Sequence, residues 1–319
     1  MPAPGKKSGS WGLRSGRTAE DDRTAVNERA EGMDRMKLGL VIEGGGMKCA
    51  YTAGILDRML DDEIRPDYVI GVSAGAACGA SFVAGQRGRN RRFFVDYVTD
   101  PDYMGLTAYR SSGEFFNLKY IYQDMTGKDG KDPLDYDAIM KNPAQLWAVA
   151  TDAETGKPRY FSKNDFSPTD YSVYMATCAI PVACRPVRMG DHIYYDGGCS
   201  DSLPVRRALE EGCDKVIILL CRPKNTIKPP EKHRGLYHRL LNRYPALIHN
   251  LDIRHERYNA VLEASKRLEE HGHALILAPH EELPITTYTK DPRQLQGLYD
   301  TALSEYEMDR EKLLDFISA

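Results

Sequence analysis

Several features that define other classes of protein are missing from this sequence. No run of apolar residues reaches the roughly 20 that a membrane-spanning helix needs. The formal net charge is −3, so no overall excess of positive charge favours nucleic acid as a partner. The seven cysteines form no C-x-x-C pair, which favours free thiols in a reducing compartment over a disulfide framework or a zinc site. We therefore expect no metal, no cofactor and no nucleic acid.

Residues 1–35 contain few large apolar side chains and mix charges with Gly, Ser and Pro. No apolar stretch follows Lys6 and Lys7, so we expect a disordered tail here and no secretory signal. The rest of the chain is predicted to hold a catalytic domain over residues 36–222. A C-terminal helical region with one strand, residues 223–319, is expected to pack on the same domain. These features together predict a cytoplasmic protein.

Residues 69–75, VIGVSAG, organise the chain. They are an apolar strand that runs into G-x-S-x-G, and the small residues after them suit a tightly packed helix. In a strand–turn–helix context this pattern is a nucleophile elbow, although such a short motif also arises by chance. Gly71 and Gly75 have no Cβ atom, so the backbone and the helix can approach closely. Ser73 would lie at the helix N-terminus, where partial positive charge favours an anionic intermediate.

A glycine turn precedes this elbow. The apolar residues 38–42 end in EGGGMK, residues 43–48, and a helical pattern follows. A dinucleotide-binding fingerprint is disfavoured because Cys49 stands where its third glycine would be, and the P-loop pattern is absent. Two interpretations remain. One is a plain strand–helix turn, and the other is an oxyanion hole formed by the N–H groups of Gly45 and Gly46 and directed at the carbonyl that Ser73 attacks.

Asp196 is the second candidate for chemistry. It follows an aromatic strand and is followed by Gly197 and Gly198, so it lies on a tight turn with little side-chain cover. One interpretation is a turn aspartate that bonds its own backbone. The other is a general base for Ser73, because a serine hydroxyl is a weak nucleophile until a base takes its proton. Of the eight histidines only His192 lies near in sequence, and none has a distinctive setting, so a Ser–Asp dyad explains more of the sequence than a triad does.

Strands and helices alternate up to residue 220, which predicts an α/β fold with a mainly parallel sheet and helices on both faces. Two basic stretches accompany this pattern. Arg87 to Arg92 is expected to be a solvated helix face, with anionic lipid or phosphate as the alternative. The segment after Arg222 combines many basic residues with apolar positions at helical spacing. It fits peripheral contact with an anionic membrane surface and, equally, a helix packed on the core. Residues 103–116 are predicted to form a lid or the mouth of a pocket.

The motifs GGGMK at residues 44–48, GVSAG at residues 71–75 and DGG at residues 196–198 together resemble the patatin-like phospholipase family, over roughly residues 37–220. The resemblance implies a three-layer α/β/α sandwich and lipid acyl hydrolysis. It implies Ser73 as nucleophile, Asp196 as base and the Gly44, Gly45 and Gly46 turn as oxyanion hole. It also implies supporting roles for the motif positions Lys48, Gly71, Gly75, Gly197 and Gly198. The family usually has Arg-Gly where this chain has Lys48-Cys49, and Lys lacks the bidentate fork of Arg.

These observations predict a serine lipid acyl hydrolase, a phospholipase or carboxylesterase that acts on a lipid or small ester. The alternative is a lipid-binding or regulatory protein that keeps the fold with little or no activity. The Cys49 departure and the basic C-terminal segment would suit that alternative.

Overall fold

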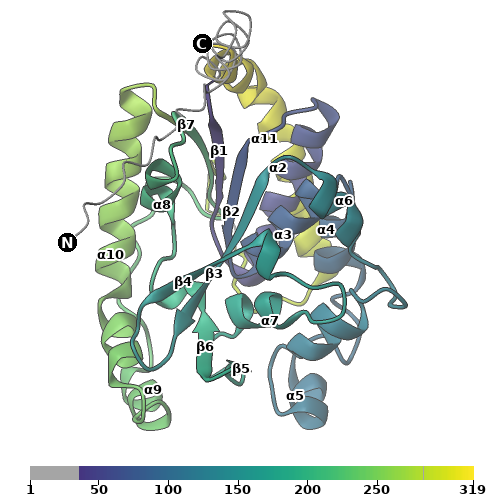
Figure 1. Cartoon of the computed structure of the whole chain (residues 1–319), viewed down its shortest axis with the longest axis vertical. Helices are drawn as coiled ribbons and strands as arrows, with labels where there is room; N and C mark the ends of the chain where they lie inside the picture. The colour runs from purple at the N-terminus through teal and green to yellow at the C-terminus, as the bar shows by residue number, and fades with distance from the viewer. Residues whose placement is uncertain (1–35, 283) are drawn as a thin grey trace, which may run out of the picture. The chain divides into compact units, whose positions relative to one another are not determined.

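The strands of the chain form one central sheet. A computed structural model describes residues 36–282 and 284–319; the predicted tail, residues 1–35, lies outside them. Within the described part, eight strands pair in the order β5-β6-β3-β2-β1-β7-β8, with β4 paired to β3 (Figure 1). Their bounds are β1 Leu38–Ile42, β2 Tyr68–Val72, β3 Gln145–Asp152, β4 Pro158–Ser162, β5 Val187–Met189, β6 His192–Asp196, β7 Lys215–Leu219 and β8 Ala274–Leu277.

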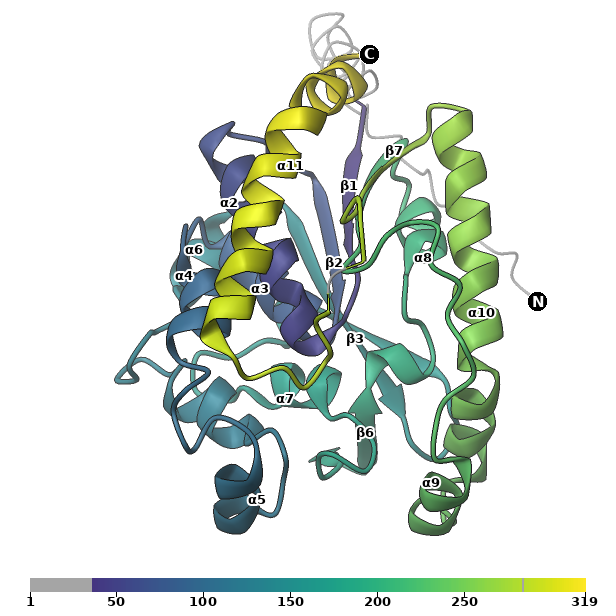
Figure 2. The ribbon, with the colours of Figure 1, turned by 180° about the vertical axis from the view of Figure 1, so that it is seen from behind.

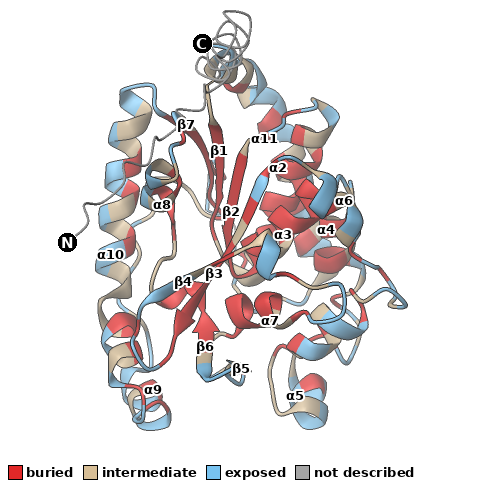
Figure 3. Ribbon diagram, viewed as in Figure 1, coloured by how far each residue is buried: buried red, intermediate tan, exposed pale blue. Residues whose placement is uncertain are grey.

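The five strands β3, β2, β1, β7 and β8 run parallel, whereas β4, β5 and β6 are antiparallel additions. Every residue of β1 and β2 is buried, which explains why these strands are apolar without alternation (Figure 3). Side chains of successive residues still point to opposite faces: Leu40 and Ile42 belong to one core cluster and Val41 to the other. The sheet therefore carries a hydrophobic core on each face.

Helices cover both cores. The helices α2 (Ala50–Asp61), α3 (Ala74–Val83) and α11 (Pro292–Ser318) lie on one face, and α8 (Val205–Glu210) and α10 (Pro245–Glu270) lie on the other (Figures 1 and 2). The predicted three-layer α/β/α sandwich with a mainly parallel sheet is thus confirmed. Short helices complete the unit: α4 (Arg89–Arg91), α5 (Leu106–Ser112), α6 (Tyr136–Lys141), α7 (Ser172–Cys178) and α9 (Arg234–Leu240).

The C-terminal residues are built into this sandwich. Strand β8 extends the sheet beyond β7, and α11 packs along α2. Two buried phenols fix that packing: Tyr299 donates to Asp57 at 2.8 Å, and Tyr51 donates to Glu305 at 2.8 Å. Across the described residues, none of the helices combines the length and the apolar character needed to span a membrane.

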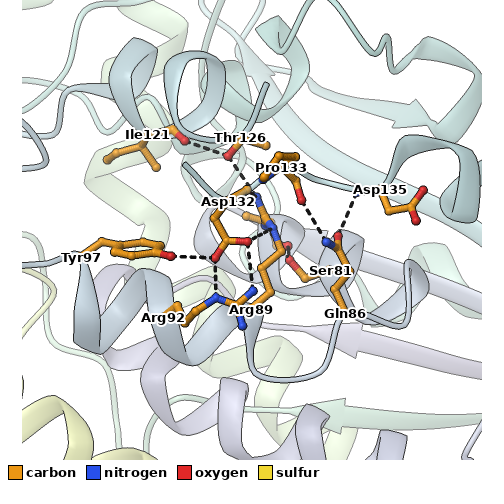
Figure 4. Close-up of polar contacts among 11 residues, drawn as sticks. Ser81, Gln86, Arg89, Arg92, Tyr97, Ile121, Thr126, Asp132, Pro133 and Asp135 are labelled. Atoms are coloured by element: carbon orange, nitrogen blue, oxygen red, sulfur yellow. Dashed lines mark hydrogen bonds and ion pairs between the residues drawn. The ribbon is translucent and has the colours of Figure 1, made fainter. Parts of the chain in front are cut away.

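The expectation of a solvated basic face at Arg87 to Arg92 is wrong for Arg89, which is only 4% exposed. Its guanidinium donates to Ser81 Oγ, Thr126 Oγ1 and the carbonyl of Asp132 (Figure 4). This burial could not be predicted from local sequence, because the partners of Arg89 lie on other elements, up to 43 residues away. The Arg89 side chain therefore ties α4 to the loop that follows residue 126.

Candidate active site

Ser73 occupies a strained turn between β2 and α3. Its backbone angles are φ 55° and ψ −135°, a region that residues with a Cβ atom seldom adopt. Two glycines permit this turn. A Cβ atom on Gly71 would lie 2.5 Å from the Cα atom of Ala76, and one on Gly75 would lie 2.5 Å from the carbonyl oxygen of Glu43. Both positions therefore exclude any larger residue.

The side chain of Thr177 stabilises the turn through hydrogen bonds. Its Oγ1 atom accepts the Ser73 amide at 2.9 Å and donates to the carbonyl oxygen of Val149 on β3. Thr177 and Ser73 are both buried, at 0% and 6% exposed. The sequence analysis missed Thr177, because a threonine in a short helix carries no local signal for this contact. The hydroxyl links the elbow to the neighbouring strand and so stabilises the strained backbone.

Strand β3 brings Asp196 to Ser73. Its residue Val149 pairs with Val72, the last residue of β2, and the next residue, Ala150, pairs with Asp196, the last residue of β6. Strand β4 occupies the other edge of β3 over the same residues. Because a strand has only two edges, β2 and β6 must meet end to end along one edge of β3. Residues 73 and 196 are thereby brought together across 123 positions of sequence.

The two side chains lie close together. The Ser73 hydroxyl is near enough to the Asp196 carboxylate to lower its pKa, and the Gly198 amide donates to Asp196 Oδ1 at 2.8 Å. Asp196 is 5% exposed, and this burial raises its pKa above the usual value for aspartate. Arg254, the Ser73 hydroxyl and the Gly198 amide oppose that rise. A Cβ atom on Gly197 would collide with the backbone of Val149, so only glycine allows this turn to lie on β3.

The glycine turn lies directly beside the serine. A Cβ atom on Gly44 would lie 2.8 Å from the Cβ atom of Ser73, and Gly46 has φ +56°. None of the described residues accepts a hydrogen bond from the amides of Gly44 or Gly45. Gly46 is the first residue of a 3₁₀ helix, Gly46–Cys49, whose first N–H groups have no partner within the helix. Lys48 lies in that helix, and its amide donates to the carbonyl of Gly45. Three backbone donors thus remain available next to Ser73.

Buried groups support the glycine turn from the other side. Glu43, 2% exposed, accepts the Cys221 amide at 2.9 Å and Arg222 Nε at 3.0 Å. The Cys221 sulfur fills the place where a Cβ atom on Gly45 would project. Cys49, which stands where the resembling family has glycine, packs its sulfur 3.7 Å from the carbonyl of Glu43. The Cys49 side chain is therefore accommodated in the buried space beneath the glycine turn and does not cover the turn's open face.

A cavity opens beside Ser73 and is lined mainly by apolar and aromatic side chains. Cys178, at the end of α7, lies between Ser73 and Tyr122: its sulfur is 3.1 Å from the Tyr122 hydroxyl, and burial raises the pKa of its thiol. A second cavity shares Phe94, Tyr103 and Tyr122 with the first. Segment 103–116, predicted as a lid or mouth, contributes Tyr103 and Phe116 to the lining and contains α5. Other lining residues are Met47, Phe94, Leu118, Ile121 and Ile180.

His192 does not contact Asp196. Its ring lies on the surface and its Nδ1 atom is 2.9 Å from Asp152 Oδ2. Within residues 36–282 and 284–319 there is also no group of three or more His, Cys, Asp or Glu residues able to hold a metal ion.

The basic segment after Arg222 was interpreted as a membrane-facing helix or a helix packed on the core, and part of it turns towards the site. Arg254 on α10 points its Nη2 atom at the Asp196 turn, within 2.8 Å of where a Cβ atom on Gly198 would lie. The positive charge of Lys228 also lowers the pKa of Asp196. Burial, with Arg254 and Arg222 nearby, lowers the pKa of Lys228 to about 7. No signal in the sequence distinguishes these two cations from the exposed ones around them.

A mostly parallel α/β/α sandwich with a serine on a strained strand–helix turn, beside an apolar cavity, is an architecture shared by acyl hydrolases. The sequence model of the patatin-like phospholipases matches residues 40–209, more than half of the chain, and the chain belongs to that family. This confirms the resemblance seen in the motifs. Residues 244–318 match a second model, a domain of unknown function called DUF6363.

Two further comparisons found similar proteins. It is 26% identical over 208 residues to the uncharacterized protein YjjU of Escherichia coli (strain K12), which covers 61% of this chain and 55% of YjjU. The chain thus spans about half of that curated relative. Among solved structures, VipD from Legionella pneumophila matches 89% of this chain and 67% of its own, with 13% identity and a TM-score of 0.45.

Proposed function

We propose that this protein is a serine lipid acyl hydrolase, a phospholipase or carboxylesterase, that works through a Ser73–Asp196 dyad. The observation that carries the proposal is the proximity of the Ser73 hydroxyl to the buried Asp196 carboxylate, next to a turn whose amides have no acceptor among the described residues. Family membership supports a lipid or small ester as the substrate. The mostly apolar cavity beside Ser73 suits an acyl chain.

In the first half-reaction Ser73 Oγ attacks the ester carbonyl while Asp196 takes the hydroxyl proton. The tetrahedral intermediate carries a negative charge on the former carbonyl oxygen. The amides of Gly44, Gly45 and Gly46 would hold that oxyanion, since donors placed in advance stabilise charge without reorganisation. When the intermediate collapses, the bond to the alcohol breaks and Asp196 returns its proton to the leaving oxygen. An acyl ester on Ser73 remains.

In the second half-reaction Asp196 takes a proton from a water molecule, which attacks the acyl-enzyme. The bond to Ser73 Oγ then breaks, Asp196 returns the proton to that oxygen, and the carboxylic acid leaves. The same carboxylate therefore acts as base and as acid in turn. Its burial supports this double role: a raised pKa makes the carboxylate a stronger base than an exposed aspartate. Position also favours Asp196 over His192, because the His192 ring lies on the surface next to Asp152.

We also propose that the protein is cytoplasmic and makes peripheral contact with the inner membrane surface. Helices α5 and α9 lie at the same end of the sheet, the lower end in Figures 1 and 2. On α9, Leu236 is 50% and Leu240 55% exposed; on α5, Leu106 is 65% exposed. Exposed arginines accompany them on both helices, a pattern that suits an anionic lipid surface. Tyr237 and Leu241 are buried, so α9 packs on the core and presents its other side.

Vesicle flotation tests this contact. The double change Leu236→Ser and Leu240→Ser should reduce recovery with vesicles that contain anionic lipid. Met308→Ser, which alters an exposed apolar residue on α11, is the control. Unchanged recovery with the α9 variant would argue against membrane contact through this segment.

A fluorophosphonate probe tests the function itself. The wild-type protein should be labelled, Ser73→Ala should not be, and Asp196→Asn should label far more slowly. Asp201→Asn is the matched control, because Asp201 is a half-buried carboxyl in the same turn region that accepts the Tyr160 hydroxyl at 2.8 Å. Hydrolysis of short- and long-chain esters then separates an esterase from a phospholipase. A folded wild-type protein that takes no label would instead favour the lipid-binding alternative.

A further inference from the structure

The C-terminal segment contributes a cation to the surroundings of Asp196. Helix α10 passes the turn at residues 196–199, and Arg254 lies at the point of approach. A Cβ atom on Gly198 would be 2.8 Å from Arg254 Nη2 and 3.0 Å from Asp196 Oδ1. The guanidinium and the carboxylate therefore flank one small space, which only glycine at position 198 leaves open. Arg254 belongs to the matched domain of unknown function and lies outside the patatin-like match.

Arg254 is held in place by Glu231. Its Nη1 atom donates to Glu231 Oε1 at 3.2 Å, and its side chain is 26% exposed. The Nε atom is buried and has no partner among the described residues. Lys228 lies 3.8 Å from the same Glu231 oxygen. One carboxylate thus serves two cations, which leaves positive charge in excess on the side facing Asp196.

The other groups around Asp196 provide little charge. Ser73 and the Gly198 amide reach it as neutral hydrogen-bond donors, and Lys228 is the second cation that acts on it. The remaining titratable neighbours are thiols and a phenol whose pKa values are raised, so they are neutral at pH 7: Cys178, Cys184, Cys199 and Tyr288. Arg254 is therefore the strongest positive influence on the carboxylate.

We propose that Arg254 is a positioning residue of this active site: it supplies the positive charge that keeps the buried Asp196 carboxylate ionised and in place next to Ser73. The proposal rests on the proposed function, in which Asp196 is the base. A Ser–Asp dyad has no third residue to orient and stabilise its base, as the aspartate does in a Ser–His–Asp triad. Here that role falls to an arginine from the far end of the chain, which gives the C-terminal domain a part in the reaction.

The pH dependence of kcat/KM tests this role with a soluble ester. Arg254→Gln should move the acidic limb upward by about one pH unit, because an arginine near an aspartate lowers its pKa by roughly 1 to 3. Below the limb kcat/KM should fall about tenfold, with recovery towards the wild-type value at higher pH. Arg257→Gln is the matched control, one turn along α10, where the guanidinium bonds Asn250. Its profile should match that of the wild type.

Arg254→Lys is the second variant and covers the case in which the glutamine variant does not fold. Lysine keeps a charge on a shorter side chain without the planar fork, so its limb should move by less than that of a folded glutamine variant. Melting temperatures identify the variants that remain folded. An acidic limb that stays at the wild-type pH in every folded Arg254 variant overturns the proposal, as does an equal loss of kcat/KM at all pH values.

The two proposals fail in different ways. If the wild-type protein shows no probe labelling and no ester hydrolysis, the proposed function fails and the role of Arg254 falls with it. If the wild-type protein is labelled at Ser73 and its activity depends on Asp196, but the Arg254 variants keep the wild-type profile, then only the role of Arg254 fails.

Discussion

Gly44 packs so closely on Ser73 that a Cβ atom on Gly44 would lie 2.8 Å from the Cβ atom of Ser73 and 2.6 Å from the carbonyl oxygen of Val72. The glycine turn and the serine turn therefore pack tightly against each other. Two features of the sequence that lie about 30 residues apart meet here because β1 and β2 are parallel neighbours. Any change of side chain at Gly44 must displace one of the two turns.

Gly44→Ala should lower kcat/KM for ester hydrolysis by about 100-fold or more. A displaced turn would remove backbone donors from the oxyanion hole, and the loss of one such donor lowers the rate by about that factor. The measurement is steady-state hydrolysis together with the melting temperature. Gly297→Ala is the control, because that glycine lies in α11 with open space around it. It should leave activity unchanged and raise stability by about 0.5–1 kcal/mol. A Gly44→Ala protein with full activity would contradict the proposed oxyanion hole.

Asp196→Asn should abolish most activity and at the same time raise the melting temperature at neutral pH. Burial raises the pKa of Asp196, so the ionised carboxylate destabilises the folded state at pH values above that pKa. The asparagine variant does not carry this charge. Its advantage should shrink as the pH falls through the raised pKa, because the folded wild-type protein then takes up its proton. Thermal denaturation from pH 4 to 8 checks the sign, and a variant less stable than the wild type at pH 7 would contradict it.

The layers of the fold were predictable because the strands at its centre are apolar throughout and the turns after them are rich in glycine. The contact between Ser73 and Asp196 depends on the register of β2 and β6 along β3, which local sequence does not encode. The relative position of β2 and β6 depends on how both strands pair with β3, so it involves three strands together.

The charged residues were harder to interpret. Arg89 and Arg254 lie in runs of basic residues. Composition suggested solvent for Arg89, with anionic lipid or phosphate as the alternative, and a membrane surface or a helix packed on the core for the segment that contains Arg254. Their partners, Asp132 and Glu231, lie 43 and 23 residues away, so no periodicity connects them. Burial of a cation is decided by whether the folded chain supplies acceptors, and only the three-dimensional structure shows that.

Lys228 provides a second test of electrostatics, through stability. Burial lowers its pKa to about 7, so below that pH the folded protein holds a buried ammonium group at a cost. Between pH 7 and the unfolded value of about 10.4 the folded state releases the proton first, and this cost declines. Lys228→Met should therefore raise the melting temperature most below pH 7 and least near pH 10. Lys232→Met, exposed in the same segment, is the control. A gap that does not change with pH would contradict the lowered pKa.

Asp132 balances two arginines near the second cavity. It accepts Arg92 Nε at 2.5 Å and the Tyr97 hydroxyl at 3.1 Å, and lies 3.5 Å from Arg89 Nε (Figure 4). Asp132→Asn would leave the buried Arg89 without a counter-charge, so we expect a loss of about 3–5 kcal/mol in the free energy of unfolding. Urea denaturation measures it. Asp135→Asn is the control, because asparagine can replace aspartate as the cap of α6. A loss below about 1 kcal/mol would show that the arginines are satisfied without the carboxylate.

Tyr288, which follows β8 in the chain, packs against Phe116, a residue that lines the cavity beside Ser73. Its ring stacks on Phe116, with centroids 5.8 Å apart, and meets Phe115 edge-on at 5.3 Å. The neighbouring Thr287 carbonyl accepts the Met47 amide at the end of the glycine turn. Tyr288→Ala should leave the wall at Phe116 unsupported and raise KM several-fold for long-chain esters, with kcat and short-chain esters little affected. Tyr288→Phe keeps the stacked ring and should behave as the wild type, because the ring makes these contacts without the hydroxyl. An equal loss of kcat for short and long chains would instead indicate that Tyr288 acts through the glycine turn, by way of Thr287.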